Sequence, residues 1–264
     1  MTDSRRAFTI IADDYGLGDR HNRVILRLLE CGLLDGVSVM VSDDLRNEDV
    51  SRLLEIAERR PIQIGLHLNL TEPMPGLSCV MPLGQLLRRS LAGGIDRKSV
   101  SRTLRVQFDL FQSSIGRSPD FIDGHQHCHC IPVVAAAVID AVRGRMDSIP
   151  CWIRSPCPRT FRGVIQALRM GGTKAVVIMA LGYVQRRRLK RASIATNADF
   201  AGIMRLDTAV STKGNLLRIL SRAGPGCVVM THPGDGADAR QLAGHAPAAR
   251  DAEAEALEAF AANP

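Results

Sequence analysis

The sequence predicts one α/β domain built on a parallel sheet or barrel. Short, β-rich apolar segments alternate along the chain with longer segments whose apolar residues recur at helical spacing. The chain has 264 residues, 45% of them hydrophobic, which is enough for a full core. Neither an internal repeat nor a low-complexity tract divides it, so we predict a single domain over residues 1–264.

Five short segments have the composition of strands. Each is rich in apolar residues and is followed by acids, glycine or proline. The first ends at Asp13 and Asp14, shortly before Gly16 and Gly18. The predicted strands are residues 8–12, 37–41, 62–68, 121–122 and 227–231.

Helical patterns lie between these strands. After the first two strands, apolar residues recur three and four positions apart up to Gly32 and Pro61, which end the helices. Pro132 opens a later helix, whereas residues 72–84 are rich in proline and glycine and predict a loop. The predicted helical segments are residues 24–29, 50–57, 100–115, 133–142, 161–170, 175–189, 216–220 and 252–261.

Polar residues with ligand or proton-transfer chemistry follow four of the strands. Asp13 and Asp14 end the first strand, and His67 ends the third. Asp123 and His125 follow the fourth, and His232 ends the last. The carboxyl ends of parallel strands meet on one rim, where ligand sites lie, so we expect these side chains to converge.

This set of residues predicts a metal-dependent hydrolase. Two imidazoles and a carboxylate match sites that hold zinc or another first-row metal and keep positions open for water. Neighbouring side chains on an extended strand diverge, so one of Asp13 and Asp14 would bind the ion and the other accept a proton. His232 could protonate a leaving group or stabilise an oxyanion.

The run HQHCHC at residues 125–130 could also form a Cys/His zinc cluster. In an extended segment, however, its three histidines share one face and both cysteines point away. We therefore expect one histidine to be a ligand and the others to support it or contact substrate.

Four motifs resemble those of the YdjC-like carbohydrate deacetylases. They are ADDYGL at residues 12–17, GLHLNLT at 65–71, DGHQHCH at 123–129 and HPG at 232–234. The resemblance implies an irregular (β/α) barrel of the polysaccharide-deacetylase type, which removes the acetyl group from an N-acetylated amino sugar.

The resemblance also assigns residue roles. It implies Asp13 as the base, His232 as the acid, and one divalent ion on Asp14, His67 and His125. Magnesium and zinc lead the candidate metals, and cobalt and manganese also suit these ligands. The residues expected to contact the substrate are Asn69, Asp123, His127 and His129.

A basic segment accounts for the net charge of +7. Residues 154–191 carry ten basic residues and no acid, and we predict a helical insertion there. A solvated surface is one interpretation; a nucleic-acid site is disfavoured, because few aromatic residues lie nearby to stack on bases. An apolar helix with a basic end also suits an anionic membrane face. The predicted contacts are Arg186, Arg187, Arg188, Lys190 and Arg191.

Such a surface would serve a lipid-linked amino sugar, on polyprenyl phosphate or another glycolipid carrier. The alternatives are a deacetylase of soluble chito-oligosaccharides, another metallohydrolase such as a phosphoesterase, and a non-catalytic binder of a sugar or lipid carrier. Asp13 and His232 argue against the binder, which needs neither base nor acid. The seven cysteines are odd in number and form no CxxC pair, which favours a protein of the reducing cytoplasm. The basic end of the apolar helix predicts that it is peripheral at the inner membrane face. The sequence does not decide whether the protein forms a homodimer.

Overall fold

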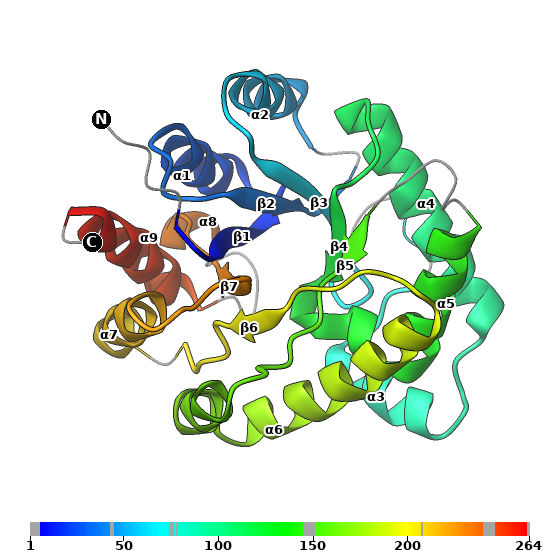
Figure 1. The fold of residues 1–264 in the computed structure, drawn as a ribbon. Coiled ribbons are helices and arrows are strands. Elements are labelled where there is room, and N and C mark those ends of the chain that lie inside the picture. Colours follow the sequence, from blue (N-terminus) through cyan, green and yellow to red (C-terminus); the bar gives the residue numbers. More distant parts are fainter. Residues whose placement is uncertain are drawn as a thin grey trace.

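The computed structural model describes residues 6–42, 45–73, 77, 79–144, 151–206, 208–239 and 246–262. Within them, seven parallel strands form one sheet in the order β5-β4-β3-β2-β1-β7-β6 (Figure 1). This confirms the α/β class and the parallel strands. The strands are β1 (Thr9–Tyr15), β2 (Gly36–Val39), β3 (Gln63–Leu68), β4 (Phe121–Gly124), β5 (Trp152–Ile153), β6 (Asp199–Ala201) and β7 (Cys227–Thr231).

The sheet curls into an irregular barrel. Its edge strands β5 and β6 are linked by the segment that leads into β6, without a regular ladder between them. The Ile153 amide donates to the Ala195 carbonyl at 3.0 Å, and the Ser155 amide donates to Asn197 Oδ1 at 2.7 Å. These bonds bring the first and last parts of the sheet together around one interior, as the predicted barrel requires.

Helices surround the sheet. Those predicted after β1, β2 and β4 are confirmed, as are the ones around residues 100–115, 216–220 and 252–261. The elements β5, β6 and α8 were missed, because segments of two to four residues are too short to show a period of hydrophobic residues. Helix α3 was also missed, and it begins inside the predicted loop. The helices are α1 (Asp19–Glu30), α2 (Asn47–Arg59), α3 (Leu83–Leu91), α4 (Arg97–Ile115), α5 (Pro132–Arg143), α6 (Phe161–Arg191), α7 (Ala209–Leu220), α8 (Gly236–Ala239) and α9 (Pro247–Ala262).

Alternation along the strands separates two apolar layers. Ile10 and Ala12 pack outward in the large core beneath the helices, while Ile11 faces inward. Phe121 and Met230 share the inward layer with residues of α6, so α6 covers the inside of the curled sheet. Because side chains alternate, the next inward positions along β1, β3 and β4 fall at the carboxyl rim of the sheet.

The two helical segments predicted at residues 161–170 and 175–189 are confirmed as the two parts of α6. It runs over 31 residues and breaks at Gly172, which has φ 57° and ψ −139°. Among the described helices, it alone is long and apolar enough to cross a membrane by length and composition, and 22% of its apolar window is buried. That residues 154–191 form an insertion stays a prediction.

Gly65 allows close packing inside the barrel. A Cβ atom built there would lie 2.3 Å from the ring of Phe121, which is fully buried and stacks on Trp152 at 4.9 Å. We therefore expect Gly65→Ala to lower the free energy of unfolding in urea by about 1–3 kcal/mol, the range for overpacking. Gly214→Ala, in open space on α7, is the control and should leave stability unchanged or raise it. Equal stability of both variants would contradict the packing argument.

Candidate metal centre and active site

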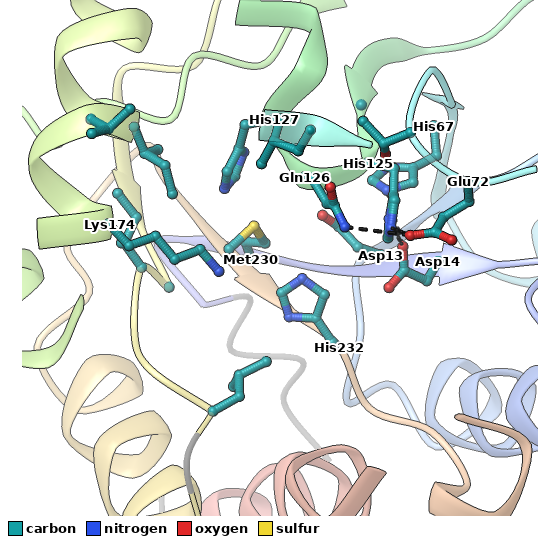
Figure 2. A pocket seen from close by; sticks show the side chains of 18 of the residues that line it. Asp13, Asp14, His67, Glu72, His125, Gln126, His127, Lys174, Met230 and His232 are labelled. Atoms are coloured by element: carbon teal, nitrogen blue, oxygen red, sulfur yellow. Dashed lines mark hydrogen bonds and ion pairs between the residues drawn. The ribbon is translucent and has the colours of Figure 1, made fainter. Parts of the chain in front are cut away.

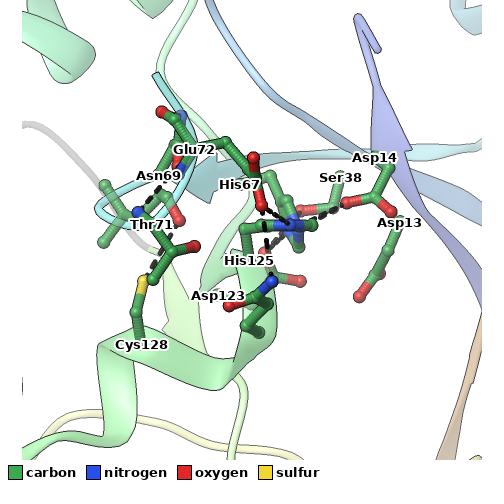
Figure 3. A network of polar contacts seen from close by, with 12 residues as sticks. Asp13, Asp14, Ser38, His67, Asn69, Thr71, Glu72, Asp123, His125 and Cys128 are labelled. Atoms are coloured by element: carbon green, nitrogen blue, oxygen red, sulfur yellow. Dashed lines mark hydrogen bonds and ion pairs between the residues drawn. The ribbon is translucent and has the colours of Figure 1, made fainter. Parts of the chain in front are cut away.

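Asp14, His67 and His125 converge at the carboxyl rim of the sheet (Figure 3). Asp14 Oδ1 lies 3.1 Å from His67 Nε2 and 2.8 Å from His125 Nδ1. Ligands of a tetrahedral zinc ion lie about 3.3 Å apart, given bond lengths near 2.0–2.1 Å. Both distances are close to this spacing, the three ligand atoms lie within 4.8 Å of one another, and all three residues are buried.

A bulge in β1 brings both neighbouring acids to this site. The register with β2 shifts between Ala12 and Tyr15, and Asp14 adopts a left-handed φ of 67°. Both acids line the same cavity, yet they belong to different groups of metal-type ligands, so their division between ion binding and proton transfer stays a prediction. Aspartate tolerates this backbone region better than most residues.

The run at residues 125–130 is a short 3-10 helix, η1 (His125–Cys130), and is not extended. Gln126 and His127 have φ of 51° and 58°, so side-chain positions cannot be inferred from strand alternation there. His125 joins the cluster directly after β4. Cys128 and Cys130 are buried, and desolvation raises the pKa of Cys128 to about 12. Neither of the two groups of metal-type ligands in the described residues includes a cysteine.

Arg250 of α9 binds the outer oxygen of Asp14. Its guanidinium donates to Asp14 Oδ2 at 2.6 Å, which leaves Oδ1 for the imidazoles. Burial alone would raise the pKa of Asp14. The nearby charges of His125 and Arg250, with hydrogen bonds from both imidazoles, more than offset this and hold the pKa well below its usual value. Asp14 is thus a carboxylate, the form that binds a cation.

Asp123 orients His67 from behind. Its Oδ1 lies 2.7 Å from His67 Nδ1, and the Ser38 hydroxyl donates to the same oxygen. With Nδ1 bound to a carboxylate, His67 presents Nε2 to the cluster. A carboxylate in this position is typical of metal-ligating histidines and makes the imidazole a stronger ligand.

Arg154 fills the space of a second group of metal-type ligands, which consists of Asp13, His67 and Asp123. Its guanidinium donates to both oxygens of Asp13, at 2.6 and 3.0 Å, and pairs with Asp123. A cation already occupies this position, so the Asp14 cluster is the better metal site. Arg154 is 1% exposed, and counting it among the surface charges of the basic segment was wrong.

His232 follows β7 and lines the same cavity as the cluster (Figure 2). Glu253, fully buried on α9, accepts from its backbone amide, and Glu253 Oε1 lies 3.6 Å from His232 Nδ1. A carboxylate at Nδ1 favours the tautomer and the orientation in which Nε2 faces the cavity. Asp13 and His232 thus flank the same space.

The four residues predicted to contact substrate lie in different places. His127 lines the cavity, and burial holds its pKa well below the usual value, so it is neutral. Asn69, Asp123 and His129 are buried and do not line the cavity. Asn69 Oδ1 accepts from the amides of Thr71 and Glu72. His129 donates to the Arg154 carbonyl at 2.9 Å, and burial lowers its pKa to about 4.

The predicted membrane-contact residues are of two kinds. Arg186 and Arg188 donate to the backbone carbonyls of Asn197 and Pro132, so part of their role is structural. The remaining three side chains, at the end of α6, are exposed: Arg187, Lys190 and Arg191.

The cavity has a volume of about 790 Å³ and two unlike ends. The metal-type cluster, Asp13 and His232 form the polar end (Figure 2). Aliphatic side chains of α3, of α6 and of the segment after β6 form the other end, and none of the described residues that line the cavity is Phe, Tyr or Trp. The apolar lining residues include Leu83, Leu87, Val177, Ile178, Leu181, Ile203, Met204 and Leu206.

Three site residues were missed by the sequence analysis. They are Arg250 and Glu253 on α9 and Ser38 on β2. The pattern of α9 indicates an alanine-rich surface helix, within which a buried Arg three residues before a buried Glu was the available signal. Ser38 interrupts an apolar strand, which is where an inward polar contact would appear.

The chain is similar in sequence to known proteins. A family model described as YdjC-like protein matches residues 7–261. A carbohydrate deacetylase of Homo sapiens is 30% identical over 156 residues, covering 54% of this chain and 47% of that protein. A chitooligosaccharide deacetylase of Yersinia pestis (strain Pestoides F) is 30% identical over 147 residues, covering 53% and 56%. The matched region thus spans about half of each relative.

One solved structure shares the fold. It is the crystal structure of a proposed cellobiose-phosphate cleavage protein from Enterococcus faecalis V583, with a TM-score of 0.63 and 16% identity. The match covers 95% of this chain and 89% of that protein. At this identity the likeness concerns the barrel alone.

Metal binding tests the cluster. We expect His67→Ala and Asp14→Asn to weaken zinc binding, measured by calorimetry, by more than about 100-fold, because each removes a direct ligand. Asp123→Asn, which changes an outer partner, should cost about 10–100-fold. Asp13→Asn and the control His127→Gln should bind zinc like the wild type. If Asp13→Asn lost zinc as severely as Asp14→Asn, the metal would belong to the second group.

Proposed function

Because the chain belongs to the YdjC-like protein family, we propose that it removes the acetyl group from an N-acetylated amino sugar by metal-dependent hydrolysis. One observation carries the proposal: Asp14, His67 and His125 form a candidate metal site, and Asp13 and His232 line the same cavity as these three residues. Amide hydrolysis needs a base on one side and an acid on the other. Relatives of the chain are named as deacetylases of carbohydrates.

When bound, a divalent ion on these ligands would polarise the acetamide carbonyl and lower the pKa of an attacking water. Asp13 accepts the proton of that water. Arg154 holds Asp13 in place through two hydrogen bonds and stabilises its charged form. His232 protonates the leaving amine, and Glu253 orients its ring and stabilises the imidazolium.

The charges around the cluster disfavour a phosphoesterase. Transferring phosphoryl groups need cations that are free to hold their oxygens. Arg154 and Arg250 lie close to the cluster, but aspartates already bind them. A neutral acetamide requires no such partner, so the site fits an amide better than a phosphate ester at the metal.

The substrate that we propose is lipid-linked. Free oligosaccharides are commonly bound by hydrogen bonds and by rings that stack on aromatic side chains. The far end of this cavity instead has aliphatic walls, which suit an acyl or isoprenoid chain. A soluble chito-oligosaccharide is the alternative, because the polar end would accept either sugar.

The exposed hydrophobic side chains of α6 support a peripheral membrane contact. Six of the eight large hydrophobic side chains that are exposed in the described residues lie on this helix: Phe161, Leu168, Val176, Val177, Tyr183 and Val184. Exposed cations follow at its end, where Arg187, Lys190 and Arg191 could pair with anionic lipids. The cytoplasmic location of this contact stays a prediction.

Acetate release tests the reaction. We expect the metal-loaded protein to release acetate from N-acetylhexosamine substrates, to stop after chelation and to resume on metal addition. Asp13→Asn should lower the rate by about 10²–10⁴-fold, the usual effect of losing a general base, while zinc stays bound. Faster release from an alkyl glycoside than from a chito-oligosaccharide supports the lipid-linked substrate, and the reverse supports the soluble one. Full activity of Asp13→Asn would refute its role.

Vesicle flotation tests the membrane contact. We expect the protein to float with phosphatidylglycerol vesicles, and the double variant Val176→Gln, Val184→Gln to float much less, because it loses apolar area without losing charge. Val210→Gln on α7 is the control, since Val210 is 85% exposed but lies outside α6. A wild-type protein that stays in the soluble fraction would rule out this contact.

A further inference from the structure

Lys174 is a cation inside the cavity that the proposed chemistry does not use. Among the described residues that line the cavity, the basic ones other than histidine are Lys174 and Arg250. Arg250 is bound to Asp14, whereas Lys174 forms no hydrogen bond or ion pair within the described part of the chain. Figure 2 shows its ammonium reaching into the cavity toward His232 and Met230.

The position of Lys174 on α6 relates it to the apolar wall. Lys174, Val177, Ile178 and Leu181 are spaced at i, i+3, i+4 and i+7, and all four line the cavity. Residues at this spacing share one face of a helix. Lys174 follows the break at Gly172 by two residues, so its ammonium group precedes the aliphatic side chains of this face along the helix.

The polar end of the cavity lies on the other side of Lys174. Lys174, His127 and His232 all line the cavity, and Figure 2 shows the ammonium of Lys174 on the side of His127, Met230 and His232. From the metal-type cluster outward, the lining therefore runs from histidines, through one lysine, to aliphatic side chains. A ligand that spans the cavity meets a cation between its sugar and its apolar part.

We propose that Lys174 binds an anionic oxygen group of the substrate, either a phosphate ester or a carboxylate, that joins the N-acetylated sugar to an apolar chain along α6. The inference rests on the proposed function in placing the acetamide at the cluster. It makes Lys174 a determinant of specificity, because a neutral glycolipid would leave its ammonium unpaired.

The environment of Lys174 agrees with this role. The side chain is solvent-accessible through the open cavity, yet the surrounding protein atoms desolvate it and lower its pKa. An anion beside the ammonium would compensate for that loss of hydration. Among the described residues that line the cavity, the carboxylates are Asp13, Asp14 and Glu72, which belong to the cluster side, so an anionic group of the substrate would supply a counter-charge beside Lys174.

Equilibrium binding tests the inference without requiring turnover. Calorimetry on the metal-loaded protein would compare decyl phosphate, decanoate, decyl glucoside and inorganic phosphate, below micelle-forming concentrations. We expect Lys174→Met to weaken the preferred anionic amphiphile by about tenfold or more, the effect of losing a charge-assisted hydrogen bond. Its affinity for decyl glucoside should not change. Lys174→Arg should retain most of the binding, and the matched control Arg169→Met, exposed on α6 outside the cavity lining, should retain all of it.

The outcomes separate the two proposals. If decyl phosphate binds more tightly than decanoate, the group bound by Lys174 is a phosphate ester, and the reverse order indicates a carboxylate. Inorganic phosphate should bind far more weakly than decyl phosphate because it lacks the alkyl chain. Unchanged binding in Lys174→Met, or an equal loss for decyl glucoside, would overturn the role of Lys174. Acetate release without any dependence on Lys174 would leave the deacetylase intact and remove this inference. Lys174-dependent binding without acetate release from any substrate would refute the deacetylase alone.

Discussion

Three buried aspartates at one rim of the sheet impose the main constraint on this structure. Asp13, Asp14 and Asp123 lie within one polar layer and are each at most 4% exposed. A buried carboxylate must be paired, because the desolvation of an unpaired charge opposes folding. Arg154 follows β5 at the sheet edge, and Arg250 comes from α9 near the end of the chain. Pairing the acids therefore draws both distant segments to the centre of the barrel.

The same charge balance explains why the cluster attracts a cation. Counting the carboxylates and the guanidiniums alone, three against two leave one negative charge in the layer. Asp14 Oδ1, which faces both imidazoles, is where a metal ion would neutralise it. Arg154 and Arg250 determine how much negative charge the aspartates retain, and His67 and His125 provide the other two ligand atoms of the metal site. The metal site thus depends on residues well beyond its three ligands.

The sequence predicts the part of this site that follows from local patterns. Strand ends are readable from apolar runs, so Asp14, His67 and His232 could be placed on one rim before the structure was known. Arg154 could not, because β5 has two residues and shows no period, so its position depends on pairing with β4. The bulge at Asp14 and the turn at Gln126 and His127 are backbone conformations, which residue spacing alone does not encode. Helix α6 was found through its two apolar halves, while its place inside the curled sheet is a tertiary property.

The left-handed backbone at Asp14 restricts which amino acids evolution can place there. A residue at this position has to tolerate a φ of 67° and also supply a carboxylate. Glycine and asparagine meet the first requirement but bring no charge, and glutamate brings the charge but tolerates the backbone less well. Aspartate alone satisfies both. The usual exchange of one acid for the other is therefore unfavourable at this position, whereas a change to asparagine or glycine would keep the bulge and lose the ligand.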